Sequence, residues 1–204
     1  KNYRDVIKDY CNKYKKKKSV FGITATTPQI RYAVEIASLI KSINPISKIV
    51  LGGPHVTLMH SSRKREFEDK LRNKDRATNE IARLSKIFDV LVCGDGEHSV
   101  FEAIKMEKGI IDADDKDSSL FLTNDDFTEL PFPARHLVDV KSYKYEIEEK
   151  NATHLIAQLG CPFHCTFCSG RNSPFLRKIR TRTNESIISE LRHLYKKYSY
   201  TGFM

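Results

Sequence analysis

The sequence contains no long apolar run. Its 204 residues include no stretch with the character of a signal segment or a membrane-spanning helix. We therefore expect a cytoplasmic protein with no membrane partner, and a reducing compartment argues against disulfides among its 5 cysteines. Acidic residues are also comparatively few, 26 against 35 basic ones, which gives a formal net charge of +9. Because the lysines are spread along the chain rather than clustered, this charge does not predict a nucleic-acid partner.

Short apolar runs alternate with amphipathic segments over the first half of the chain. Strand patterns lie at residues 20–25, 48–51 and 88–93, and helical periodicity is found at 3–16, at 29–43 behind a Thr27 N-cap, in the second half of 61–87, and at 98–108. This order predicts an α/β fold with a Rossmann-like (flavodoxin-like) parallel sheet at residues 1–108. Ligands of such sheets bind beyond the carboxyl ends of the strands.

The second half of the chain changes character. Residues 109–150 include an acidic turn at 112–117 and two prolines at 131 and 133, so we predict a connector, with a short hairpin at Leu120–Leu122. A new domain is expected at 151–204, with a strand at 154–159, a helix at 184–198 and a further strand from Tyr200. This succession resembles the opening of a β/α barrel, whose chemistry lies on the loops after the strands.

Three cysteines are grouped at the start of this second domain. Cys161, Cys165 and Cys168 follow Gly160 in a C-x3-C-x2-C spacing that can converge on one soft metal centre. Structural zinc sites and 4Fe–4S clusters usually take four protein ligands. Three cysteines indicate either a cluster with one iron open to another ligand or a zinc site completed by His164 or a distant residue. Cys11 and Cys93 are remote in sequence, and we expect them to be structural.

The segment from Cys161 to Cys168 resembles the cluster loop of the radical S-adenosylmethionine (radical SAM) enzymes. The resemblance implies that the three cysteines hold a 4Fe–4S cluster and that S-adenosylmethionine chelates the open iron. It also implies reductive cleavage to a 5′-deoxyadenosyl radical, with an electron donor such as flavodoxin or ferredoxin. Phe167 is expected near the adenine, and Ser169 and Gly170 beside the same cofactor.

A second pair of motifs resembles the cobalamin-binding domain that precedes many radical SAM domains. The motifs are Gly52-Gly-Pro-His-Val-Thr57 and Gly94-Asp-Gly-Glu97, and the Leu130–Arg135 segment resembles the connector of that family. The glycines let a backbone approach a bulky ligand. An Asp-x-His-x-x-Gly signature is absent, so His55 is expected in the turn rather than on cobalt. The cobalamin contacts implied by the resemblance are Thr24, Thr26, Thr27, Gly52, Gly53, His55, Thr57, Gly94, Gly96 and Glu97.

These resemblances predict a cobalamin-dependent radical SAM enzyme truncated at both ends, and the activity expected first is a methyltransferase that acts on an unreactive carbon of a small molecule or peptide. Two alternatives stay open: a cyclase or rearrangement enzyme of the same family, and a non-catalytic ligand-binding module with a structural zinc site. The 204-residue piece is not expected to be active alone. A basic stretch after the cysteines is interpreted as a solvated strip rather than an anion site; it comprises Arg171, Arg177, Arg180 and Arg182.

Overall fold

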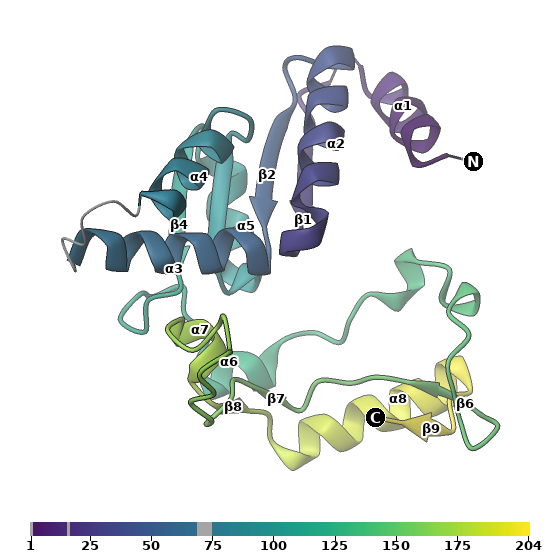
Figure 1. Cartoon of the computed structure of the whole chain (residues 1–204). Coiled ribbons are helices and arrows are strands. Elements are labelled where there is room, and N and C mark those ends of the chain that lie inside the picture. Colours follow the sequence, from purple (N-terminus) through teal and green to yellow (C-terminus); the bar gives the residue numbers. More distant parts are fainter. Residues whose placement is uncertain (1, 16, 69–74) are drawn as a thin grey trace. The chain divides into compact units, whose positions relative to one another are not determined.

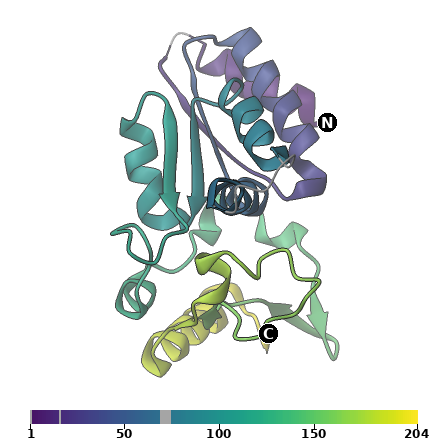
Figure 2. The same ribbon diagram turned by 60° about the vertical axis from the view of Figure 1, so that its left-hand side comes forward.

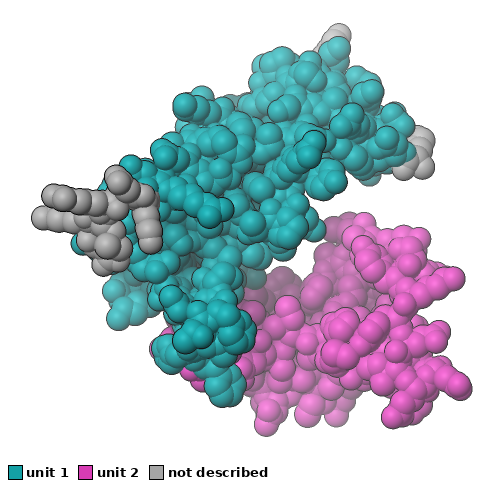
Figure 3. Space-filling model, viewed as in Figure 1, with its two compact units in different colours: residues 1–121, 163–177 teal, residues 122–162, 178–204 magenta. Residues whose placement is uncertain are grey.

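The computed structural model describes residues 2–15, 17–68 and 75–204. The chain divides into two compact units, which Figure 3 shows in different colours. The first unit comprises Lys1–Phe121 and Phe163–Arg177, and the second comprises Leu122–Pro162 and Lys178–Met204. The cysteine loop therefore contributes residues to both units. In the described ranges, no helix is both long and apolar enough to cross a bilayer.

The first unit contains the predicted parallel sheet. Its strands are β1 (Val20–Thr24), β2 (Lys48–Gly52), β3 (Val90–Gly94) and β4 (Gly109–Ala113), in the order β1-β2-β3-β4. An α/β fold with a parallel sheet is thus confirmed. The sequence predicted three of these strands but assigned β4 to the connector, because Ile110 and Ile111 are the only large apolar residues in it and aspartates follow at once.

Helices cover both faces of this sheet, as Figure 2 shows. Alternate strand residues serve the two faces: Leu51 and Leu91 pack with α2 (Ile30–Ile43) and α4 (Arg76–Ser85), and Val50 and Val92 pack with α5 (Gly96–Lys105). Helix α1 (Tyr3–Lys13) contributes Cys11 to the core on the α2 side. This arrangement, with helices on both faces, follows from strands that are apolar on both sides.

Two helix starts differ from the prediction. A 3-10 turn, η1 (Thr27–Gln29), precedes α2, and its N-cap is Thr26 rather than Thr27. The Thr26 backbone N–H donates to Gln29 Oε1 at 3.0 Å, so the glutamine closes the first turn. Helix α5 begins at Gly96, earlier than the expected residue 98, since Asp95 is its extended N-cap.

Helix α3 (Pro54–Glu68) was not predicted, because its first residues were interpreted as a glycine-rich turn. Pro54 suits the first turn of a helix, which explains the abrupt start. The helix runs across the carboxyl ends of the strands (Figure 1). The His55 N–H donates to the Ala25 carbonyl after β1 at 3.0 Å. Thr57 Oγ1 accepts a hydrogen bond from the Gly94 N–H of β3 at 3.0 Å. Lys64 Nζ donates to Asp112 of β4 at 2.9 Å. The edge expected to receive a ligand therefore carries a helix.

The second unit is built from short elements. Its helical segments are α6 (Asn124–Glu129), η2 (Arg135–Leu137), η3 (Val140–Ser142) and α8 (Asn184–Tyr198), and its strands are β5 (Glu146–Ile147), β6 (Lys150–Thr153), β7 (Gln158–Leu159), β8 (Arg180–Thr181) and β9 (Gly202–Phe203). Strand β6 pairs in parallel with β9 and antiparallel with β5, and β7 pairs antiparallel with β8. Segment α7 (Pro174–Arg177) belongs to the first unit.

Helix α8 has the predicted bounds, and β6, α8 and β9 form a strand–helix–strand unit with parallel strands. The predicted hairpin does not form, and the strand expected before the cysteines is shorter than predicted. No strand forms at Leu120–Leu122, and only Gln158–Leu159 of the strand expected at 154–159 is extended in a sheet. The carbonyls of His154 and Ile156 instead accept hydrogen bonds from Arg135 and Arg182 side chains, which replace a neighbouring strand.

Candidate functional site

The three grouped cysteines lie on an exposed loop without helix or strand. Cys161, Cys165 and Cys168 are free, exposed thiols. The Cys168 N–H donates to the Cys165 carbonyl at 3.1 Å, and the Arg171 N–H donates to the Cys168 carbonyl at 3.3 Å, so consecutive turns shape the loop. Across the described ranges, no three His, Cys, Asp or Glu side chains are gathered as a metal site. The donor set still has the chemistry that an iron–sulfur cluster needs, and the ligand assignment stays a prediction.

The other cysteines have the opposite character. Cys11 and Cys93 are completely buried among the apolar residues of the first unit. Burial, followed by the negative charges of Asp112 and Asp114, raises the pKa of the Cys93 thiol well above its ordinary range. A thiol held protonated in this way is a poor metal ligand. The predicted structural role of both residues is consistent with these positions.

The residues expected beside S-adenosylmethionine follow the cysteines closely. Phe167 is 91% exposed, so its ring is available to a planar ligand, and Ser169 is exposed as well. Gly170 is buried, and a Cβ at this position would lie 2.5 Å from Leu176 Cδ1. The absence of a side chain at Gly170 therefore permits a close turn, whatever ligand the loop takes.

Two of the glycines expected to contact cobalamin are required for close packing at the sheet edge. Gly53 and Gly94 have positive φ angles of 97° and 94°. An added Cβ would overlap Thr24 Oγ1 at Gly53 and the Ala113 backbone at Gly94. Only glycine fits where these turns touch their neighbours. By contrast, a Cβ on Gly96 meets nothing within 4 Å.

The remaining residues predicted for cobalamin fall into two groups. His55 and Thr57 are buried: the His55 ring nitrogens lie 3.1 Å from Thr27 Oγ1 and 3.2 Å from Glu80 Oε1, and Thr57 Oγ1 donates to the Gly53 carbonyl at 3.0 Å. These side chains are engaged by the fold. Gly52 is half-buried, and the exposed group comprises Thr24, Thr26, Thr27, Gly96 and Glu97. The exposed group is accessible to solvent at this edge, whereas the buried group is not.

A charged cluster that the sequence did not predict lies between α3 and the end of β4. Asp112 Oδ2 is 3.2 Å from His60 Nε2 and 2.9 Å from Lys64 Nζ. Burial alone raises the pKa of Asp112, but hydrogen bonds from His60 and Lys64 outweigh it and lower the pKa to about 2. The signal in the sequence was the pair of aspartates, Asp112 and Asp114, directly after an apolar pair.

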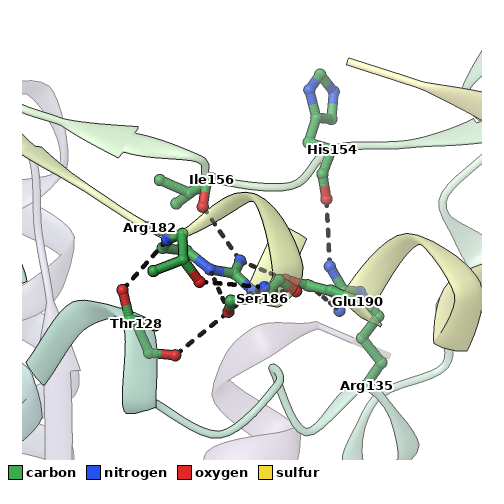
Figure 4. A network of polar contacts seen from close by, with 8 residues as sticks. Thr128, Arg135, His154, Ile156, Arg182, Ser186 and Glu190 are labelled. Atoms are coloured by element: carbon green, nitrogen blue, oxygen red, sulfur yellow. Dashed lines mark hydrogen bonds and ion pairs between the residues drawn. The ribbon is translucent and has the colours of Figure 1, made fainter. Parts of the chain in front are cut away.

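A second charged network fixes the segment before the cysteines in the second unit (Figure 4). Glu190 of α8 is 1% exposed and accepts from Arg135 Nη1 at 3.0 Å and from Arg182 Nη1 at 2.5 Å. The same two arginines donate to the carbonyls of His154 and Ile156. The interpretation of a solvated basic strip is therefore wrong for Arg182, and also for Arg180, which is buried. Arg171 is exposed, as expected.

Comparisons with known proteins bear on what such a loop does. No family model matches the chain. It is 27% identical over 191 residues to an uncharacterized methyltransferase of Pyrococcus horikoshii, covering 88% of this chain and 37% of that protein. It is 24% identical over 204 residues to the anaerobic magnesium-protoporphyrin IX monomethyl ester cyclase of Rubrivivax gelatinosus, covering 92% of this chain and 33% of that protein.

The corresponding cyclase of Cereibacter sphaeroides is also 24% identical, over 91% of this chain and 29% of that protein. The chain thus spans about a third of the length of the curated relatives it matches. A methyltransferase and a cyclase are two activities that the radical SAM resemblance implies, so these relatives support that class of enzyme. The crystal structure of the N-terminal domain of a hypothetical protein of Thermotoga maritima matches 52% of this chain and 70% of its own. The sequence identity of this match is 19%, and its TM-score is only 0.35.

Proposed function

We propose that the chain forms part of a radical SAM enzyme in which Cys161, Cys165 and Cys168 hold a 4Fe–4S cluster. The observation that carries the proposal is the contrast among the cysteines, three exposed on one short loop and two buried in the core. When bound, the cluster supplies one-electron reduction of S-adenosylmethionine. Three protein thiolates leave one iron for this cofactor, whereas a structural zinc ion takes four protein ligands.

The chain's own residues bind and orient. Phe167 presents an exposed ring to the adenine, and Ser169 offers a hydroxyl on the same loop. Gly160, with a φ of 84°, makes the turn into the loop where a Cβ would overlap the Lys178 carbonyl. Under this proposal the cofactors supply the chemistry, and the protein binds and orients them.

The finer proposal is a methyltransferase that acts on an unreactive carbon of a small molecule or peptide, with electrons from a flavodoxin or ferredoxin. The first of the relatives described above is named a methyltransferase, and the cyclase names of the others support ring formation as the alternative. Within this proposal cobalamin is bound through the exposed residues Thr24, Thr26, Thr27, Gly96 and Glu97 rather than through His55 and Thr57.

Anaerobic reconstitution of the whole protein with iron and sulfide tests the assignment. We expect a brown protein with about four irons per chain and, after reduction, an electron paramagnetic resonance signal that changes when S-adenosylmethionine is added. Zinc in place of iron would falsify the proposal and favour the ligand-binding module. Hydroxocobalamin retained through gel filtration supports the cobalamin part, and its loss with an intact cluster restricts the function to a radical SAM enzyme without it.

A further inference from the structure

The segment that follows the cysteines is anchored on a buried carboxylate of the first unit. Asp114 is 0% exposed and lies directly after β4. Its Oδ1 accepts from Ser173 Oγ at 2.6 Å and from the Phe175 N–H at 2.8 Å. Ser173 is 1% exposed, so both ends of the shorter bond are shielded from water.

Because Asp114 is buried, its carboxylate depends on hydrogen bonds from the protein. A carboxylate removed from water is costly unless donors replace the lost hydration. Burial raises the pKa of Asp114, and the bonds from Ser173 and Phe175 act in the opposite direction. The second oxygen, Oδ2, has no hydrogen-bond partner among the described atoms. The Asp114 carboxylate therefore receives its direct hydrogen bonds from the Ser173 hydroxyl and the Phe175 N–H.

A second contact holds the same segment. Ser61 Oγ of α3 donates to the Asn172 carbonyl at 3.0 Å. Lys64, one turn further along α3, donates to Asp112 Oδ2 at 2.9 Å and to the Asp114 carbonyl at 3.4 Å. Helix α3 thus fixes both the end of β4 and the segment that lies on it.

Short-range bonds continue from the anchor to the cysteines. The Ser173 N–H donates to the Gly170 carbonyl at 3.1 Å, and the Arg171 N–H donates to the Cys168 carbonyl at 3.3 Å. Arg171 Nη1 also donates to the Thr166 carbonyl at 2.7 Å, between Cys165 and Cys168. Restricting Ser173 therefore restricts the turns that present these two thiols.

We propose that Asp114 is a positioning residue that, through Ser173 and Phe175, fixes the cluster-binding turns bearing Cys165 and Cys168 on the α/β sheet unit. The inference rests on the proposed cluster for its consequence, but the anchor itself exists without the cluster. The sheet unit would thereby position the cluster-binding turns, and this role is separate from the binding of any ligand at the strand ends.

The test compares Asp114→Ala, Asp114→Asn and Ser173→Ala with Asp117→Ala, an exposed residue of the same acidic turn. In protein without iron, we expect amide hydrogen exchange at residues 173–177 to rise about tenfold in Asp114→Ala, because the charge-assisted hydrogen bonds to the carboxylate are lost. The rise in Ser173→Ala should be smaller. Asp114→Asn retains an oxygen acceptor and should restore slow exchange. Asp117→Ala should match the unmodified protein.

After anaerobic reconstitution of the whole protein, we expect Asp114→Ala to lose more than half of its iron and to show an altered paramagnetic resonance spectrum, with Asp114→Asn largely restored. If Asp114→Ala does not fold by circular dichroism, Ser173→Ala decides the question with the same readouts. Unchanged exchange overturns the anchor, and faster exchange with unchanged iron and spectrum overturns its role in cluster binding. An unmodified protein that binds no iron refutes the proposed function, while the exchange data still decide the anchor.

Discussion

Arg182 Nη1 lies 2.5 Å from Glu190 Oε2, and both side chains are almost completely withdrawn from solvent. Arg135 meets the other carboxylate oxygen at 3.0 Å, so one acid compensates two buried cations. Because both arginines also hold backbone carbonyls before the cysteine loop, Glu190 organises that side of the loop within the second unit.

Replacing Glu190 with alanine should destabilise the second unit by about 3 to 5 kcal/mol, because removal of one partner leaves buried charges uncompensated. Urea unfolding followed by circular dichroism measures the change. Glu185→Ala, at an exposed position of the same helix, should cost under about 1 kcal/mol. A loss of similar small size in both variants would show that the network contributes little to stability.

Replacing Gly94 with alanine should cost about 3 kcal/mol or more, since its φ of 94° is unfavourable for alanine and the new Cβ overlaps the Ala113 backbone. Gly96→Ala is the matched control two residues along, where a Cβ meets nothing within 4 Å. Thermal unfolding of both variants provides the comparison. Equal melting temperatures would contradict the close approach of β3 and β4 at this turn.

The stability of the first unit should fall in acid because of Asp112. Its pKa is about 2 in the folded protein, below the unfolded value of about 3.9. A depressed pKa contributes stability that is complete above about pH 4 and is lost as pH falls through about 2. Asp112→Asn should therefore cost about 2 kcal/mol at neutral pH and flatten the loss of stability between these two values. Urea titrations at several pH values check this, and an unchanged slope argues against the His60 and Lys64 contacts.

Single alanine variants of Cys161, Cys165 and Cys168 should each reduce reconstituted iron from about four per chain to less than about one. Cys93→Ala, which removes a buried thiol, should keep the full iron content despite some loss of stability. Colorimetric iron and sulfide assays are sufficient. Retention of iron by two or more of the loop variants would remove these thiols from the ligand set.

The sequence predicted the elements whose periodicity is local and long. Helix α8 has its apolar residues at Ile187, Leu191 and Leu194, and its bounds were correct. Strand β4 was missed because a five-residue strand with two isoleucines resembles a loop, and only pairing with β3 identifies it. Helix α3 was missed because Gly52 and Gly53 suggested a turn, although Pro54 starts a helix.

For the candidate site, the sequence identified the thiols but not what holds them. The spacing of the three cysteines is local, so it is visible along the chain. The partners of Asp114 and Glu190 are not, because Ser173 and Arg135 lie 59 and 55 residues away from them. A buried acid becomes recognisable only when the fold supplies its donors, which is why the sequence placed Asp114 in a connector and interpreted the basic stretch as solvated.

Helix α3 bonds to the ends of β1, β3 and β4, and this has a mechanical consequence. One helix ties together strands that lie far apart along the chain, so these strand ends should loosen together rather than one at a time when α3 unfolds.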